Sequence, residues 1–307
     1  MPFSGGDRRV PWIIMGIFLF FSVLIITAVE VALPAVVIYP AMYCFFAERV
    51  PLRWPVLIAC VPLALSIIPA YSFGAALYAV ILICALIMYL FLKRGNIGLA
   101  VAAPSLLIFI MVVASFVGMS YRSGLNVEEI LTRWAADVIS QMKKFSEGAG
   151  LSSSEMFEFR EKLPVFQERL VTLFPSIVVT SAAVIMWINL LIIKWRYRAI
   201  SIREWKSPDW VVAFFILAGL LSLIQDKYAQ VTGLNLLVIV GQVYFFQGLA
   251  IISVFMDSRK WPGIIRWPLY ILILIQIYMM VIVAGFGLFD TWFDFRKRIR
   301  TPKGDMQ

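Results

Sequence analysis

Long apolar segments separated by short polar stretches make up most of this chain. A helix needs about 20 predominantly apolar residues to cross a bilayer, and several of these segments reach or approach that length. The pattern predicts an all-α fold: a polytopic integral membrane helical bundle with eight or nine membrane segments. The segments are residues 12–29, 31–47, 54–70, 73–92, 97–120, 172–194, 210–225, 234–256 and 267–289.

One longer stretch, residues 121–176, is polar, with seven basic and eight acidic residues. Asn126 followed by Glu129 matches a capping box, and apolar residues then recur at helical spacing. Ser152 followed by Glu155 starts a second such pattern. These signals predict one extramembrane amphipathic helical hairpin, which lies on the membrane surface or folds against the bundle.

The hairpin divides the chain into an N-terminal part, residues 1–120, and a C-terminal part, residues 177–307. The first part holds about five membrane segments, and the second ends in a basic tail. Proline removes a backbone donor and clashes with the preceding turn, so the second and third segments are expected to be kinked or broken. Broken helices in a membrane must be surrounded by protein or water, so these prolines indicate either a cavity among the first four segments or packing kinks without a functional role. The prolines concerned are Pro34, Pro40, Pro62 and Pro69.

The composition supports a membrane location. Apolar residues make up 62% of the chain and charged residues 15%, with a mean hydropathy of +0.90. Soluble domains have about 45–50% apolar and about 25% charged residues. The net charge of +9 lies largely in loops beside apolar segments, as expected for cytoplasmic loops near anionic lipid headgroups rather than for nucleic-acid binding.

The same basic residues predict the topology. A cytoplasmic N-terminus places the basic loops inside, and the dense basic cluster from Arg296 to Lys303 favours a cytoplasmic C-terminus as well. With both ends in the cytoplasm the number of membrane crossings is even, so one of the nine segments does not cross the membrane fully. Segment 234–256 is the candidate for a re-entrant segment, because it contains Gln242 and Gln247.

The sequence offers little for catalysis. It contains no histidine, and its three cysteines stand singly inside apolar runs. Walker, nucleophile-elbow and zinc-protease motifs are not found. We therefore expect no enzyme activity, no cofactor and no metal site.

Three polar residues are candidates for contact with a ligand. Glu30 is flanked by apolar residues without a basic neighbour, which marks either a functional carboxylate in the cavity or an ordinary solvated turn. Gln242 and Gln247 could contact a polar ligand, although such amides more often form hydrogen bonds between helices.

The C-terminal end of the last segment is the candidate for a partner interface. Asp290, Asp294 and Arg298 are spaced four residues apart, so on one helix they would share a face of alternating charge. With Arg296, they could form a docking surface for a cytoplasmic partner. The alternative is a helix terminus anchored at the membrane interface by its aromatic residues.

The motif Gly287-Leu-Phe-Asp290-Thr-Trp-Phe-Asp294-Phe-Arg296, together with Asn235 and Gln247-Gly248-Leu-Ala, resembles the YybS-like family of bacterial membrane proteins. The resemblance implies a multi-pass protein of the bacterial inner membrane. That family is distantly similar to the substrate-binding S components of energy-coupling-factor transporters. The wider similarity implies a ligand cavity among the helices and a separate ATPase module.

Two hypotheses for the function follow. The first is a transporter-like protein that binds a small-molecule ligand within the bundle. The alternative is a membrane scaffold or assembly protein that acts through protein–protein contacts without transport. The expected partners are the lipid bilayer, a small ligand, and other membrane proteins or a second copy of the chain.

Overall fold

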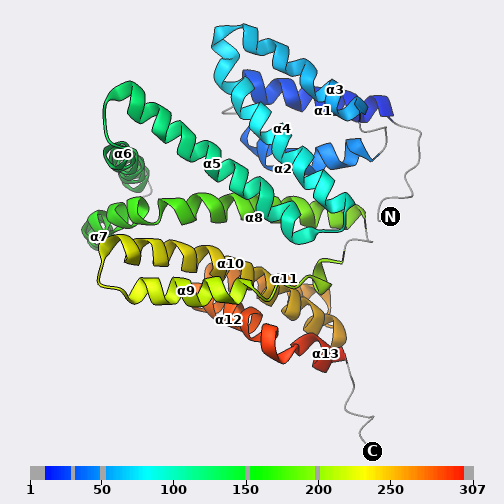
Figure 1. Ribbon diagram of the computed structural model, residues 1–307, viewed down its shortest axis with the longest axis vertical. Helices are drawn as coiled ribbons and strands as arrows, with labels where there is room; N and C mark the ends of the chain where they lie inside the picture. The colour runs from blue at the N-terminus through cyan, green and yellow to red at the C-terminus, as the bar shows by residue number, and fades with distance from the viewer. Residues whose placement is uncertain (1–10, 29–31, 49–52, 149–152, 198–200, 301–307) are drawn as a thin grey trace, which may run out of the picture.

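The computed structural model describes residues 11–28, 32–48, 53–148, 153–197 and 201–300, and all regular structure within these ranges is helical. Helices α1 to α5 lie on one side of the long helix α8, and helices α9 to α13 lie on the other (Figure 1). This arrangement confirms the prediction of an all-α bundle.

The N-terminal part contains five α-helices and a broken third segment. In that segment an α-helix gives way to a 3-10 helix next to Pro62, so the predicted break is present. The elements are α1 (Pro11–Thr27), α2 (Leu33–Ala47), α3 (Arg53–Cys60), η1 (Val61–Ile67), η2 (Pro69–Tyr71), α4 (Ser72–Lys93) and α5 (Ile97–Ser123).

Buried tyrosines fill the centre of this part. The Tyr39 and Tyr78 hydroxyl oxygens lie 2.7 Å apart, and the Tyr78 hydroxyl also donates to the Ala59 carbonyl oxygen at 2.8 Å. A pocket of about 260 Å³ lies beside this network, between α1, α2 and the end of α8. Glu30 lies outside the described residues, so the cavity that it was expected to reach stays a prediction.

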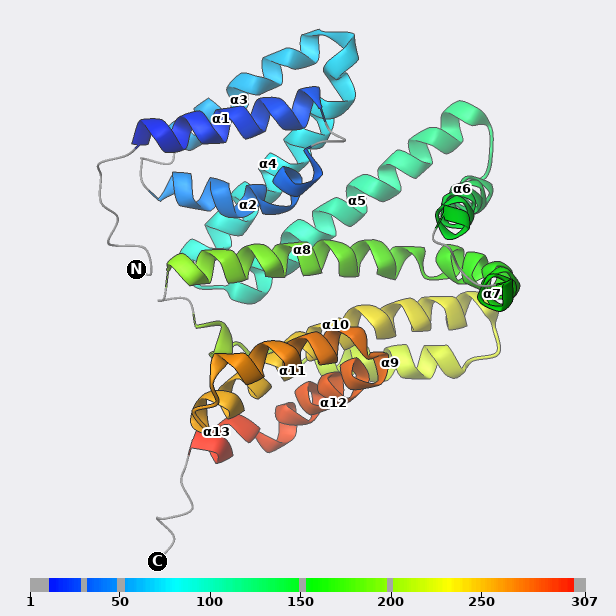
Figure 2. The same ribbon diagram turned by 180° about the vertical axis from the view of Figure 1, so that it is seen from behind.

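The predicted amphipathic hairpin is present as α6 (Val127–Gly148) and α7 (Ser153–Thr172). The two helices pack on each other and lie across the ends of α5 and α8 (Figure 2). The predicted stripe of α6 faces inward only in part, since Ile130 is buried whereas Phe145 near the end of the helix is 80% exposed. Trp134 is half-buried, and its ring centroid lies 5.1 Å from that of Phe174 at the start of α8. We call this the hairpin end of the bundle.

The C-terminal part is built around the longest helix, α10. Helices α9 and α10 form an antiparallel pair that approaches closely at Gly233, where an added Cβ would overlap the backbone of α9. Helix α12 packs on another side of α10. The elements are α8 (Phe174–Arg196), η3 (Ile202–Glu204), α9 (Val211–Leu223), α10 (Lys227–Ser258), α11 (Gly263–Ile275), α12 (Ile277–Phe293) and α13 (Phe295–Arg300).

The interrupted segment of the C-terminal part is not the expected one. Segment 234–256 belongs to the continuous helix α10, so the prediction that it turns back was wrong. Its Gln242 and Gln247 form hydrogen bonds to neighbouring elements and do not interrupt the helix. The break lies instead in segment 267–289, where α11 and α12 meet at Gln276 with a bend of 104°.

Four helices in the described ranges are long and apolar enough to cross a membrane, and the bent α11–α12 pair would make a fifth. Several shorter apolar helices run beside them, so the predicted number of eight or nine segments stays a prediction. The four long spans are Pro69–Lys93, Ile97–Ser123, Phe174–Arg196 and Lys227–Ser258. The shorter helices are Met15–Thr27, Pro34–Ala47, Pro55–Ile67 and Val211–Leu223.

Asn189 of α8 repairs the hydrogen bonding of α2 around Pro40. Proline at position 40 disturbs the helical hydrogen bonds around it. The Ala41 amide donates to Asn189 Oδ1 at 2.9 Å, and Asn189 Nδ2 donates to the Val37 carbonyl at 2.6 Å. The side chain from α8 thus bridges the donor and acceptor that an undisturbed helix would join directly, since residue 41 would normally bond residue 37.

A second asparagine makes the same repair where α7 meets α8, beside Pro175. The Ser176 amide donates to Asn235 Oδ1 at 2.9 Å, and Asn235 Nδ2 donates to the Thr172 carbonyl at 2.8 Å. Leaving such a buried donor or acceptor unpaired costs about 1–3 kcal/mol, so each asparagine stabilises a kink and joins two helices.

Candidate functional site

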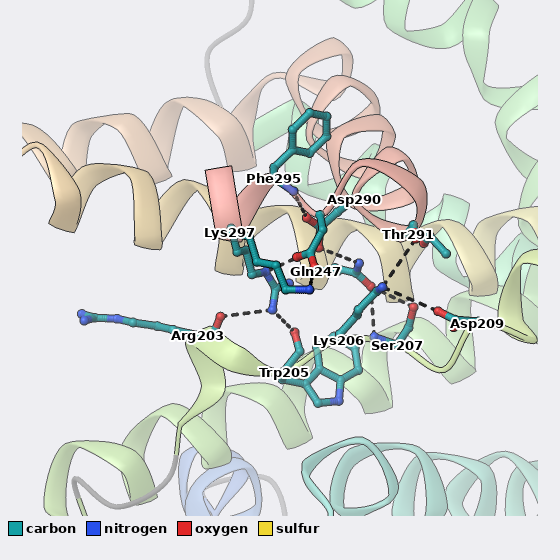
Figure 3. Close-up of polar contacts among 12 residues, drawn as sticks. Arg203, Trp205, Lys206, Ser207, Asp209, Gln247, Asp290, Thr291, Phe295 and Lys297 are labelled. Atoms are coloured by element: carbon teal, nitrogen blue, oxygen red, sulfur yellow. Dashed lines mark hydrogen bonds and ion pairs between the residues drawn. The ribbon is translucent and has the colours of Figure 1, made fainter. Parts of the chain in front are cut away.

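The close approach of α10 and α12 positions the site. A Cβ added to Gly248 would overlap the Val283 carbonyl, and one added to Gly287 would overlap the Tyr244 carbonyl. The two backbones are therefore in direct contact, which only glycine permits. This contact places Gln247 of α10 beside Asp290 of α12 (Figure 3).

Asp290 is the centre of a buried polar group, with 1% of its surface exposed. Its Oδ1 accepts a hydrogen bond from the Phe295 amide at 2.8 Å. Its Oδ2 accepts one from Gln247 Nε2 at 3.2 Å and lies 3.5 Å from Nε of Arg296. A buried carboxylate needs such donors, because burial without them carries a large desolvation cost.

Gln247 connects this carboxylate to the loop before α9. Its Oε1 accepts hydrogen bonds from the Ser207 amide at 3.0 Å and from the Ser207 hydroxyl at 2.8 Å. The amide oxygen of Gln247 thus accepts hydrogen bonds from the loop, and its nitrogen donates one to Asp290. A single side chain of α10 therefore connects that loop to α12.

Arg296 closes the group from the other side. It is buried, and its Nη1 donates to the Trp205 carbonyl at 2.7 Å and to the Arg203 carbonyl at 3.2 Å. We call Ser207, Gln247, Asp290 and Arg296 the Asp290 cluster. It joins α10, α12, α13 and the loop between α8 and α9 at one end of the bundle.

A second ion-pair group lies at the same end, around Asp257. Arg203 and Arg266 both pair with the Asp257 carboxylate, which joins η3 to the end of α10 and the start of α11. Sequence analysis did not single out these residues, since nothing in their spacing indicates that they meet. Because α11 starts here and α12 ends at the Asp290 cluster, both outer ends of the bent α11–α12 pair lie at this end of the bundle.

We call this the basic end, because its loops carry most of the positive charge near the helix ends. The α4–α5 loop also lies here, since Gly98 faces the Trp205 ring. The start of α1 and the end of α12 point to the same side of the bundle (Figure 2). The basic residues are Lys93, Arg94, Lys194, Arg196, Arg203, Lys206, Arg259, Lys260, Arg266, Arg296, Lys297 and Arg298.

The expected charged face of the last helix does not form. Asp294 has a φ of 45°, which ends α12 and separates it from α13. Asp290 is buried, whereas Arg298 is exposed over the Phe293 ring at 5.9 Å. The prediction of one face at spacings of four residues was wrong, because Asp290 accepts the Phe295 amide and the chain turns at Asp294 to allow it.

Asp294 forms its own ion pair at the surface, outside the spans. Lys297 Nζ lies 2.8 Å from Asp294 Oδ2. The hydrogen bond to this ammonium lowers the pKa of Asp294 below its ordinary value. The pair is solvent-exposed, so its contribution to stability is small.

Of the predicted ligand-binding residues, Gln242 lies elsewhere. Its Nε2 donates to the Thr180 carbonyl at 2.8 Å, which joins α10 to α8. Gln247 instead lies in the cluster with the predicted interface residues Asp290 and Arg296. The structure therefore combines residues that the sequence assigned to two different roles.

The Asp290 cluster holds helices together. The Asp290 oxygens face protein donors, and the Gln247 oxygen is occupied by Ser207. Among the described residues, no group of three or more His, Cys, Asp or Glu side chains could hold a metal ion. The arrangement joins the end of α12 and the start of α13 to α10 and to the loop between α8 and α9. We call these contacts the fastening of the basic end.

Two comparisons relate this chain to known proteins. A family profile described as "Predicted membrane protein (DUF2232)" matches residues 10–291. The chain belongs to this family. It is also 25% identical over 244 residues to "Uncharacterized protein YybS" of Bacillus subtilis (strain 168), which covers 75% of this chain and 78% of that protein.

The family match confirms the resemblance stated from the sequence and the assignment to the membrane. The profile spans the N-terminal helices, the hairpin and α8 to α12, so the described bundle is the unit that the family shares. No solved structure matches the chain. The similarity to S components of energy-coupling-factor transporters stays a prediction.

Proposed function

We propose that the protein is a membrane scaffold that binds a protein partner at its basic end. The observation that carries this proposal is the use of four amide side chains within the apolar helices. Asn189, Asn235, Gln242 and Gln247 all form hydrogen bonds to other helices or loops of the chain. Polar groups that bind a ligand would be directed into a cavity, whereas these fix the positions of helices.

The scaffold presents a defined charged surface. The Asp290 cluster and the Asp257 ion pairs hold the loop between α8 and α9 against α10 and α13. Lys297 and Arg298 lie outside this fastening, exposed on α13. A surface of cations on a rigid base suits an acidic face of a partner protein.

The basic end faces the cytoplasm in this proposal, and the hairpin end faces the opposite side. The positive-inside rule supports this orientation, since the basic residues of the short loops gather at one end. A cysteine in place of exposed Arg298 is expected to resist an impermeant maleimide in intact cells, whereas one in place of exposed Lys144 on α6 is expected to react. The reverse labelling pattern would contradict the orientation.

Photo-crosslinking in the native membrane tests the scaffold itself. A photoreactive phenylalanine analogue in place of Arg298 is expected to give one adduct of discrete mass with another protein. The same analogue at Lys144 is the matched control, because that residue is exposed at the hairpin end. Adducts with lipid alone from both positions would contradict a scaffold that binds at the basic end.

A second candidate function is binding of an anionic amphiphile, because a pocket of about 580 Å³ lies where α5 meets α6. Its lining includes the apolar side chains of Phe116, Met119 and Trp134, and the charged side chains of Arg122, Arg133 and Asp137. Apolar walls beside two guanidinium groups suit an acyl chain with an anionic headgroup. This candidate agrees with the small-ligand hypothesis but places the ligand at the hairpin end, not among the first four segments.

A further inference from the structure

A large apolar side chain is exposed at the tip of the hairpin, where α6 ends and α7 begins. Phe145, in the last turn of α6, is 80% exposed. Nearer the start of α6, the Trp134 ring is half-buried, with its centroid 5.1 Å from that of Phe174. The two positions differ by 11 residues, which is about three turns of 3.6 residues, so both side chains lie on one face of α6.

This face of α6 is directed toward the membrane. Beside Trp134 it meets Phe116 and Met119, which lie in the last two turns of the span α5. Figure 2 shows α6 and α7 end-on, at the ends of α5 and α8. The hairpin therefore runs across the end of the bundle, and the Trp134 face of α6 is directed back along α5.

The length of α8 sets the level of this face in the membrane. Its 23 residues extend about 35 Å, slightly more than a hydrocarbon core about 30 Å thick. Lys194 and Arg196 at its C-terminal end require the headgroup region of one leaflet. Phe174 at its start therefore lies within a few ångströms of the opposite headgroup region, and Trp134 packs on it there.

The bundle surface next to this face is exposed to lipid. Helix α5 is the least buried of the four long spans, and Met119, which meets α6, is still 54% exposed. Phe145 continues this apolar surface about 16 Å along α6 from Trp134. Lys143 and Lys144 point about 200° and 100° away from Phe145, as expected for a helix in the membrane interface with its cations in water.

We propose that Phe145 anchors the tip of the hairpin in the leaflet at the hairpin end, among the acyl chains just below the phospholipid headgroups. Helices that lie in the interface place phenylalanine at this depth and lysine on their polar face. The partner is the phospholipid surface, and the anchor holds α6 and α7 along it. This inference depends neither on the scaffold proposed for the basic end nor on a ligand between α5 and α6.

Fluorescence quenching in lipid nanodiscs tests the anchor, because both membrane faces are accessible there. Cysteines replace residues 141–145 one at a time and carry the dye NBD, in a chain whose exposed native cysteine, Cys60, is changed to serine. The discs contain phosphatidylcholine and phosphatidylglycerol, with or without a nitroxide on the upper acyl chain. Nitroxide is expected to quench the dye at position 145 about threefold more than at position 144, with a second maximum at position 142. Iodide in the water is expected to give the reverse order.

A second pair of variants removes the anchor itself. Phe145→Gln is expected to make a dye at position 142 about twofold more accessible to iodide, because the tip then leaves the acyl chains. Lys144→Gln is the matched control, since it is exposed on another side of α6, and it is expected to leave the quenching unchanged. Equal iodide quenching at positions 144 and 145 would overturn the proposal, because the face would then lie in water. Shielding of position 145 from both quenchers would also overturn it, because protein would then cover the face.

Discussion

Replacing Gly287 by alanine is expected to destabilise the protein by about 3 kcal/mol, because the added methyl group would overlap the Tyr244 carbonyl. The contact is with backbone, which cannot rotate away as a side chain can. Helices α10 and α12 would have to separate, and the hydrogen bond between Gln247 and Asp290 would lengthen with them. Equilibrium unfolding in mixed detergent micelles measures the loss.

Gly285 is the control for this prediction. It lies in the same helix two residues away, and an added Cβ there would meet no atom within 4 Å. Alanine at this position is expected to be neutral or to stabilise the helix by up to about 1 kcal/mol, because glycine is the weaker helix former. Equal losses from both substitutions would show that the close approach at Gly287 does not hold α12 in place.

Asp290→Asn is expected to cost about 3 kcal/mol, because it removes the carboxylate that pairs with the buried Arg296 charge. The new amide nitrogen would also face a donor, either the Phe295 amide or Gln247 Nε2. The Asp257 ion pairs and the hydrogen bond from Arg296 to the Trp205 carbonyl would still hold the loop between α8 and α9, so partial loosening of the basic end is expected. Thermal unfolding and protease cleavage in the loop between α8 and α9 measure the effect.

The matched control is Asp294→Asn. This carboxylate pairs with Lys297 at the surface, and asparagine tolerates its positive φ, so a change of about 0–1 kcal/mol is expected. Because Lys297 lowers the pKa of Asp294, the small contribution of this pair is present above the ordinary aspartate pKa. It is lost as the pH falls through the lowered value. A loss for Asp294→Asn as large as that for Asp290→Asn would contradict the central role of Asp290.

Much of the helical fold could be predicted from the sequence, because long apolar runs and capping signals depend on neighbouring residues. The hairpin followed from Asn126 and the helical spacing after it, and the break near Pro62 followed from the chemistry of proline. The bend at Gln276 could not be predicted in this way. Residues 269–284 contain neither proline nor glycine, so the hydropathy pattern predicts one continuous span there.

The candidate site could be predicted only in pieces. Asp290 and Arg296 stood out in the tail motif, and Gln247 stood out as an amide in an apolar segment. Their meeting depends on packing between α10 and α12, and Gln247 and Asp290 are 43 residues apart in the sequence. The expected charged face was wrong because α12 ends at Asp294 in the left-handed conformation, and the Phe295 amide beyond it donates to the Asp290 side chain.

The asparagine repair of α2 has a consequence for biogenesis. Helix α2 leaves the ribosome long before its partner, since Ala41 and Asn189 are 148 residues apart. At about 5–20 residues per second, roughly 7–30 s pass before Asn189 is synthesised. During that interval the Ala41 amide and the Val37 carbonyl lack their final partner in the membrane. The nascent N-terminal half therefore has a period of vulnerability to membrane proteases and of dependence on insertion chaperones, which ends when α8 docks.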